Sequence, residues 1–173
     1  MTSNVWVEKY RPKRLEDVIL PANVKAKFRG FIDSGKIPNL ILSGSSGVGK
    51  TTIARAMLEE IGAEYMVLNG SLERSINLLR NEIVQFASTI SMTGGHKYII
   101  FDEADNLQGD TQKALRNFIE KYSGNCGWIL TCNFKEKLID AIHSRCAIVD
   151  FEITKKTKPA IAKEFYSSVT HIL

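Results

Sequence analysis

Residues 44–51, Gly-Ser-Ser-Gly-Val-Gly-Lys-Thr, follow the spacing G-x-x-x-x-G-K-T. Glycine has no side chain to block close approach and reaches positive φ, so the backbone N–H groups of such a loop can surround a polyphosphate. The Lys50 ammonium can then reach the β- and γ-phosphates, and the Thr51 hydroxyl can ligate Mg²⁺. The predicted phosphate-binding residues are Gly44, Ser45, Ser46, Gly47, Val48, Gly49, Lys50, Thr51 and Thr52.

The residues around this loop distinguish a phosphate site from an ordinary glycine-serine loop. Ile41 and Leu42 precede it, and Ala54, Met57 and Ile61 follow it at helical spacing. A phosphate loop needs a strand before it and a helix after it. Because both are predicted here, the pattern favours the binding of a nucleoside triphosphate.

Two acidic residues end the apolar run at residues 97–101. Asp102 is predicted to hold Mg²⁺, directly or through water, and Glu103 to polarise the water that attacks the γ-phosphate. An acidic strand end by itself is just as typical of a solvated turn. Its combination with the phosphate loop predicts a nucleotide-hydrolysing site.

Asn133 and Arg145 carry weaker signals. Asn133 ends the apolar run 128–132, where it could donate to the γ-phosphate or the attacking water, although asparagine also commonly forms turns there. Arg145, between a predicted helix and a predicted strand, is either a surface arginine or a guanidinium directed toward a neighbouring subunit. The histidines and cysteines lack metal-ligand spacing, so no metal besides Mg²⁺ is predicted.

Strand and helix patterns alternate along the chain, as in α/β proteins. The predicted strands lie near residues 40–43, 65–68, 97–102, 128–133 and 147–151, and the predicted helices at 23–34, 50–62, from 71, from 110 and at 135–142. This pattern predicts a P-loop NTPase with a five-stranded, mainly parallel sheet flanked by helices. Its ligand should lie at the carboxyl ends of the strands.

The two ends of the chain are less regular. Residues 1–21 combine charge, two prolines and scattered apolar side chains, which indicates an extended arm. The arm either straps the surface, which is the commoner arrangement, or closes over a nucleotide base with Tyr10, Val18 and Ile19. Residues 158–171 could begin a helix of a further domain, but too few residues follow 151 to bury a second core.

Composition narrows the class of protein. The 173 residues suffice for one sizeable α/β core, and a net charge of +4 is compatible with a polyanionic partner but also common on ordinary surfaces. An odd number of cysteines argues against a closed disulfide framework and predicts a reducing, intracellular compartment. No apolar run approaches the roughly 20 residues of a membrane span, so a soluble protein is expected.

Several motifs together resemble those of the AAA+ ATPase subunits of sliding-clamp loaders. The motifs are W-V-E-K-Y-R-P at 6–12, the phosphate loop at 44–51, L-N-G-S at 68–71, D-E-A-D at 102–105, T-C-N at 131–133 and S-R-C at 144–146. The sequences of these motifs are similar to those of replication factor C small subunits. Residues 19–21 and 35–38 look most like the ATPase subunit of a tailed-bacteriophage clamp loader.

The resemblance implies an AAA+ module of a pentameric assembly that uses ATP and Mg²⁺ to open a sliding clamp and load it onto primer-template DNA. It implies that Lys50, Glu103 and Asn133 act in catalysis and that Arg145 reaches the nucleotide of a neighbouring subunit. The adenine would then be bordered by Tyr10, Arg11, Pro12, Val18 and Ile19.

The same resemblance implies regulatory residues. Asn69 would hold Glu103 unproductive until DNA binds, and Gln112 would couple neighbouring subunits. Arg74 and Arg80 are implied DNA contacts, although their own pattern indicates a solvated charged face. The expected partners are a sliding clamp, primer-template DNA and other clamp-loader subunits, with no membrane.

Clamp-loader subunits continue through a helical lid and a collar. By the resemblance, residues 1–151 form the AAA+ nucleotide-binding domain, with 1–21 as its arm, and residues 152–173 begin a truncated lid. The expected location is the cytoplasm, that of the host for a bacteriophage protein, or the nucleus for a eukaryotic one.

Two other functions fit parts of the pattern. A non-hydrolysing assembly subunit or a truncated fragment would keep the nucleotide fold; the short C-terminus favours it, whereas intact Lys50, Glu103 and Asn133 argue against it. The letters D-E-A-D also suggest a helicase. The chain has no room for a second motor domain, which argues against that function.

Overall fold

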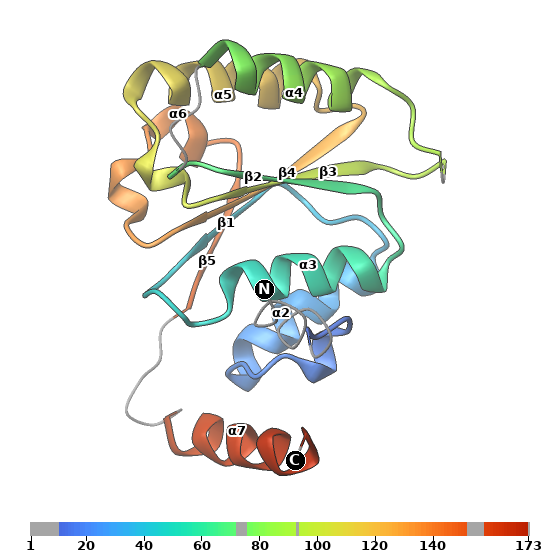
Figure 1. The fold of residues 1–173 in the computed structure, drawn as a ribbon, viewed down its shortest axis with the longest axis vertical. Helices are drawn as coiled ribbons and strands as arrows, with labels where there is room; N and C mark the ends of the chain where they lie inside the picture. The colour runs from blue at the N-terminus through green and yellow to red at the C-terminus, as the bar shows by residue number, and fades with distance from the viewer. Residues whose placement is uncertain (1–10, 72–75, 93, 152–157, 173) are drawn as a thin grey trace, which may run out of the picture.

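The computed structural model describes residues 11–71, 76–92, 94–151 and 158–172. Its sheet consists of β1 (Leu40–Ser43), β2 (Tyr65–Asn69), β3 (Lys97–Asp102), β4 (Cys126–Cys132) and β5 (Ala147–Asp150). The strand order is β2-β3-β4-β1-β5, and all neighbouring strands pair in parallel (Figure 1). The predicted five-stranded parallel sheet is therefore confirmed.

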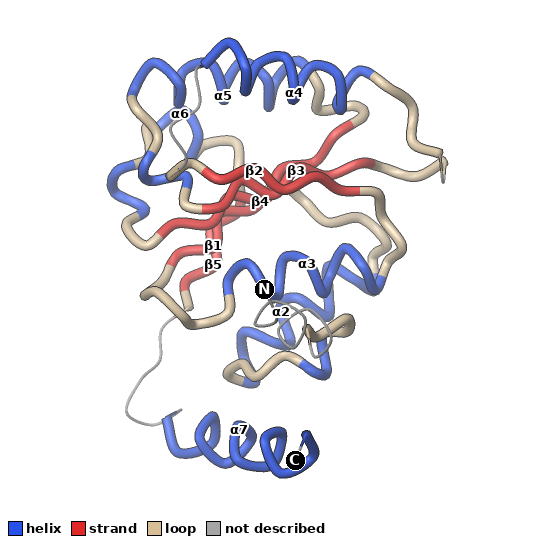
Figure 2. Tube along the Cα trace, viewed as in Figure 1, coloured by secondary structure: helices blue, strands red, loops and turns tan. Residues whose placement is uncertain are grey.

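Helices cover both faces of this sheet, as Figure 2 shows. One layer contains α2 (Ala22–Asp33) and α3 (Lys50–Glu60), and the other α4 (Ile76–Ser88) and α5 (Gly109–Lys121), with the short α6 (Asp140–His143) nearby. Successive residues of β1 point to opposite layers: Leu40 and Leu42 pack toward α2 and α3, and Ile41 packs toward α4 and α5. Burial on both faces explains the uninterrupted apolar runs of the central strands.

Two predicted helices differ in their details. The helix predicted at 135–142 is two separate turns, a 3₁₀ turn (Lys135–Lys137) and α6, because Leu138 and Ile139 adopt extended backbone. Leu138 is buried there, and the Ile139 N–H donates to the Gln112 side chain at 2.9 Å. The helix predicted from residue 110 begins at Gly109, so Asp110 lies in its first turn.

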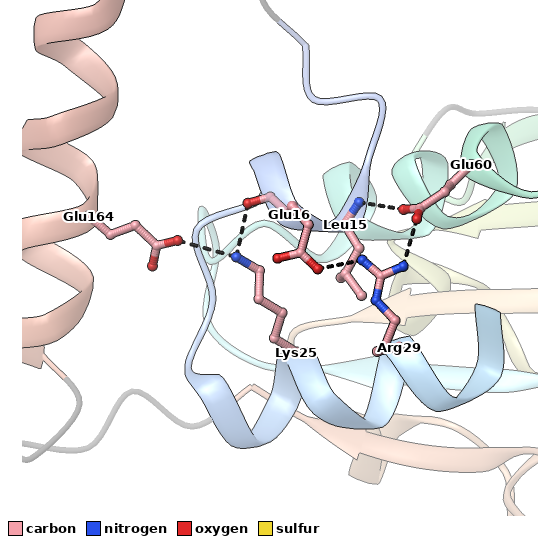
Figure 3. Close-up of polar contacts among 6 residues, drawn as sticks. All are labelled: Leu15, Glu16, Lys25, Arg29, Glu60 and Glu164. Atoms are coloured by element: carbon pink, nitrogen blue, oxygen red, sulfur yellow. Dashed lines mark hydrogen bonds and ion pairs between the residues drawn. The ribbon is translucent and has the colours of Figure 1, made fainter. Parts of the chain in front are cut away.

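The described part of the N-terminal arm straps the α2–α3 side of the domain. Apart from a 3₁₀ turn (Leu15–Asp17), residues 11–21 are irregular or extended. Leu15, Val18 and Leu20 are buried in the core on this side. Glu60 accepts the Leu15 N–H and the Arg29 guanidinium, both at 2.7 Å, and so anchors the arm (Figure 3). These residues therefore pack against the domain as a strap does, and their place beside a nucleotide base stays a prediction.

The expected C-terminal helix is α7 (Lys158–Ile172), which lies beyond α2 in Figure 1. Its Glu164 accepts from Lys25 of α2 at 3.2 Å, and Lys25 also donates to the Glu16 carbonyl of the arm at 3.0 Å (Figure 3). Lys25 thus joins the two ends of the chain. Within the described segments, no helix combines the length and the apolar composition of a membrane span.

Candidate functional site

The phosphate loop connects the end of β1 to the start of α3, at the edge where the strands end. Gly47 and Gly49 adopt left-handed backbone, with φ of 78° and 92°, which only glycine reaches without strain. Gly44 must be glycine for another reason, since a Cβ atom there would lie 2.8 Å from the Phe151 Cβ. The loop therefore presents the N-terminus of α3, with its partial positive charge, to the site.

Lys50 is the charged centre of this edge. Its side chain is buried, and its ammonium donates to the carbonyls of Gly44 at 2.7 Å and Ser45 at 2.8 Å and to Asn133 Oδ1 at 2.9 Å. Burial lowers the pKa of Lys50 from its ordinary value, and the nearby Asp102 carboxylate partly opposes that shift. All three acceptors are neutral oxygens, which are weaker partners for an ammonium than a phosphate oxygen.

Thr51 and Asp102 face each other across the start of α3 and the end of β3. The Thr51 hydroxyl donates to Asp102 Oδ1 at 2.6 Å. Hydroxyl and carboxylate oxygens are hard ligands of the kind that Mg²⁺ prefers, and Mg²⁺ in phosphate sites takes few protein ligands. The two predicted metal ligands are therefore together, and their chemistry fits Mg²⁺.

Thr131 is a site residue that its sequence pattern does not identify. Its hydroxyl donates to Asp102 and accepts the Glu103 N–H at 3.1 Å, and its side chain is buried. One threonine of β4 thus holds both acidic residues of β3 in place. The available signal is that Thr131 is the hydroxyl residue in an otherwise apolar run.

Glu103 adopts left-handed backbone with a φ of 54°. Among the described residues it is the one non-glycine residue with a positive φ. Such a conformation costs about 1–3 kcal/mol and has to be imposed by its surroundings. The Ser71 hydroxyl donates to the Glu103 carboxylate and accepts from Asn106 at 2.7 Å. Gly70 gives this contact its space, since a Cβ atom there would meet the Glu103 carbonyl oxygen at 2.5 Å.

The contact expected from Asn69 to Glu103 is made by Ser71 instead. Asn69 Oδ1 accepts the Ser71 N–H at 2.7 Å, and within the described chain no hydrogen bond joins Asn69 to Glu103. The asparagine closes a turn on its own backbone, a common use of this side chain. That turn brings the Ser71 hydroxyl to the glutamate.

Two cavities meet at the phosphate loop. A polar cavity of about 240 Å³ is lined by Ser46, Gly47, Gly49, Lys50, Thr51, Thr52, Asp102, Glu103, Thr131, Cys132 and Asn133. A mainly apolar cavity of about 310 Å³ is lined by Pro12, Asp17, Val18, Ile19, Leu20, Pro21, Gly47, Val48, Gly49, Thr52, Phe151, Ile161 and Phe165. Gly47, Gly49 and Thr52 line both, so the two cavities adjoin.

The apolar cavity combines both ends of the chain. Pro12, Val18 and Ile19, which the resemblance implies beside the adenine, line it, whereas Arg11 does not. Tyr10 lies outside the described residues. Ile161 and Phe165 of α7 complete the cavity, although nothing in the sequence pattern assigns them to it.

Arg145 lies away from the polar cavity of its own chain. Its guanidinium donates to Glu120 at 2.8 Å and to the Ala141 carbonyl at 2.5 Å. Hydrogen bonding to Arg145 lowers the pKa of Glu120 below its ordinary value. In this structure Arg145 is therefore an ion-paired residue at the end of α6.

Gln112 is used inside the chain rather than at its surface. The side chain is 4% exposed and donates to the Leu107 carbonyl at 3.1 Å and the Lys137 carbonyl at 3.0 Å, besides accepting from Ile139. The buried Gln112 side chain is therefore not placed to contact a neighbouring subunit directly. Arg80 is exposed on α4, and Arg74 lies outside the described residues.

Residues 40–153 match the AAA family, the ATPase family associated with various cellular activities. The chain belongs to this family. Solved structures of RuvB from Thermotoga maritima have the same fold: one variant superposes with a TM-score of 0.71 at 23% identity, covering 93% of this chain and 55% of RuvB. Another, described as a Holliday junction branch migration motor, superposes with a TM-score of 0.70 at 22% identity, covering 93% and 55%.

This AAA chain is also similar to archaeal replication factor C small subunits. It is 43% identical to that of Methanocella arvoryzae over 153 residues, covering 85% of this chain and 48% of the relative. It is 39% identical to that of Methanosarcina barkeri over 178 residues, covering 96% and 53%. The predicted likeness to these clamp-loader subunits is confirmed, and the finer preference for a bacteriophage subunit stays a prediction. The chain spans about half the length of these relatives.

Proposed function

We propose that this AAA chain is the ATP-binding and ATP-hydrolysing module of a sliding-clamp loader. The observation that carries the proposal is the convergence of Lys50, Thr51, Asp102, Glu103 and Asn133 on one polar cavity that adjoins an apolar one. Similarity to replication factor C small subunits supports the clamp-loader role. The partners would be a sliding clamp, primer-template DNA and further subunits, in the cytoplasm or the nucleus.

The two cavities suit the two ends of ATP. The triphosphate would lie in the polar cavity, where its charged oxygens replace the neutral acceptors that now hold Lys50. Thr51 and Asp102 would hold Mg²⁺, which neutralises charge on the phosphates when bound. The adenine would lie in the apolar cavity, between Val18 of the arm and Ile161 of α7.

In this proposal Glu103 is the general base and Asn133 the side chain that contacts the γ-phosphate or the attacking water. Lys50 releases Asn133 Oδ1 when it turns to the phosphates, so Asn133 becomes available only once nucleotide is bound. The Ser71 hydroxyl occupies one of the positions at which Glu103 could accept a proton from water, and it restrains the carboxylate until the bond is released. The restraint implied for Asn69 therefore acts through the Ser71 hydroxyl, and contact of DNA with the Arg74–Arg80 segment would release it.

The roles that need a neighbouring subunit belong to the same proposal. Arg145 would leave the partly exposed Glu120 to reach the γ-phosphate bound by the next subunit, a contribution typically worth about 10³- to 10⁵-fold in turnover. Gln112 would act indirectly, by fixing the segment that leads from β4 to α6 and Arg145. Residues 152–173 would begin the lid of the nucleotide-binding domain formed by 1–151.

A nucleotide-holding subunit without hydrolysis is the second candidate. The bond from Ser71 to Glu103 favours it, because that bond restrains the carboxylate that would have to activate water. The two candidates differ in turnover and not in binding.

The test is ATP hydrolysis by the chain with and without primer-template DNA, a sliding clamp and the separately made C-terminal remainder of a related subunit. Glu103→Gln should abolish DNA-stimulated turnover and keep ATP binding, whereas Glu136→Gln, an exposed glutamate, should change neither. Ser71→Ala should raise the DNA-free rate several-fold and reduce the stimulation by DNA. ATP binding without hydrolysis under every condition would replace the proposal by the nucleotide-holding subunit.

A further inference from the structure

Asp105 is a buried acid that the proposed mechanism leaves without a task. It is the last letter of D-E-A-D, 7% exposed, and it lies on the 3₁₀ turn (Ala104–Asn106) that follows Glu103. Its Oδ2 accepts the N–H groups of Asn133 and Phe134, both at 3.1 Å. The carboxylate therefore caps the backbone just after β4, at the residue that holds Lys50.

These two bonds restrain the backbone that carries Asn133. Bonds to an ionised acceptor are roughly twice as strong as neutral ones, so they restrain Asn133 tightly. The other oxygen, Oδ1, is buried and has no hydrogen-bond partner in the described structure. A half-satisfied buried carboxylate is costly, and a neutral acceptor would cap the turn with less desolvation. The negative charge of the Asp105 carboxylate therefore strengthens the restraint on the Asn133 backbone.

Asn133 is thereby held from two sides. Asp105 fixes its backbone, and the Lys50 ammonium binds its side-chain Oδ1 at 2.9 Å. Resting on the function proposed above, the second restraint ends when Lys50 turns to the phosphates. The first remains, because it involves no group that meets the nucleotide.

We propose that Asp105 is a positioning residue, which aims the Asn133 amide at the γ-phosphate once Lys50 has released it. The turn that carries Asp105 directly follows Glu103, and its Asn106 donates to Ser71. The general base and the γ-phosphate contact are therefore positioned by one short turn. Displacing Asp105 affects recognition of the third phosphate and leaves the rest of the nucleotide bound.

The test combines amide hydrogen exchange with the affinities for Mg²⁺-ATP and Mg²⁺-ADP, so it needs no turnover. In Asp105→Ala the Asn133 and Phe134 amides should exchange about tenfold faster in the ATP-bound chain, since their charged acceptor is gone. The preference for ATP over ADP should fall as far as in Asn133→Ala, and the double variant should lose nothing more. Asp110→Ala, the matched exposed acid on α5, should change neither quantity.

Asp105→Asn keeps the shape and one carbonyl acceptor, so its two amides should exchange only about threefold faster, as expected for a neutral acceptor. If Asp105→Ala does not fold, this variant decides: faster exchange confined to these amides supports the proposal, and unchanged or uniformly faster exchange overturns it. Additive losses in the double variant, or a wild-type chain that binds ATP and ADP equally, would overturn it as well. A wild-type chain that binds neither nucleotide would instead contradict the proposed function.

Discussion

The two cavities that meet at the phosphate loop are built in different ways. The polar one is formed by strand ends and the start of α3, whose side chains bond to one another: Lys50 to Asn133, Thr51 to Asp102, and Thr131 to both acids at the end of β3. The apolar one is closed by the arm and α7, which Lys25 joins through a pair whose side chains are 18% and 41% exposed. The proposed phosphate site is therefore held rigidly by the sheet, whereas the proposed base site depends on segments that can move apart at little cost.

Removing the charge of the polar cavity should have the largest effect. Lys50→Ala is expected to weaken Mg²⁺-ATP binding about a hundredfold, because a buried ammonium–phosphate contact is charge-assisted. Titration with a fluorescent ATP analogue measures it. Lys113→Ala, an exposed lysine whose side chain is 71% accessible, is the matched control and should bind normally. If Lys50→Ala bound Mg²⁺-ATP as well as the Lys113→Ala control does, Lys50 would not contact the phosphates.

Adding a side-chain carbon at Gly70, next to Glu103 in the polar cavity, should destabilise the fold. Gly70→Ala would place a Cβ atom 2.5 Å from the Glu103 carbonyl oxygen, so its free energy of unfolding should drop by about 1–3 kcal/mol. Urea denaturation measures the drop. Gly124→Ala, where a Cβ atom meets nothing within 4 Å, is the control. Equal stability of the two variants would show that the turn at Gly70 is as adaptable as an open loop.

The apolar cavity should contribute less, and only to the base. Phe165→Ala is expected to weaken ATP binding about three- to tenfold, the range for losing part of an apolar contact, and to leave tripolyphosphate binding unchanged. Competition titrations with both ligands measure this difference. Lys163→Ala, an exposed residue of the same helix whose side chain does not line the cavity, should match the wild type. A parallel loss of tripolyphosphate affinity would place Phe165 at the phosphates instead.

The smallest effect is expected where the two ends of the chain are tied. Glu164→Gln removes the negative charge that pairs with Lys25. Exposed pairs contribute about 0.2–1 kcal/mol, so ATP affinity should fall less than about fivefold. The difference from the wild type should disappear in about 1 M salt, which screens exposed charges. Lys163→Gln on the same helix is the control. A loss that persists at high salt would show that α7 is held by something other than this pair.

The contrast between the cavities also explains what the sequence could predict. The phosphate loop, Asp102 and Glu103 could be predicted from the sequence, because short motifs next to periodic strands and helices specify them locally. Ser71, and not Asn69, contacts Glu103 because the Asn69 side chain closes a turn on its own backbone. The spacing of residues in the sequence does not determine that turn.

The burial of Gln112 depends on contacts between segments far apart in the chain, and so does the place of α7 over the apolar cavity. The same holds for the extended backbone at Leu138 and Ile139, which a helical pattern of residues concealed. Residues whose partners are distant in sequence were therefore the ones that only the structure placed.

A crystal structure with Mg²⁺ and a non-hydrolysable ATP analogue tests the central claim most directly. We expect one nucleotide across both cavities, with Lys50 moved from Asn133 onto the phosphates, the metal at Thr51 and Asp102, and the adenine between Val18 and Ile161. Phosphates bound elsewhere, or an adenine lying outside the cavity of the arm and α7, would contradict it.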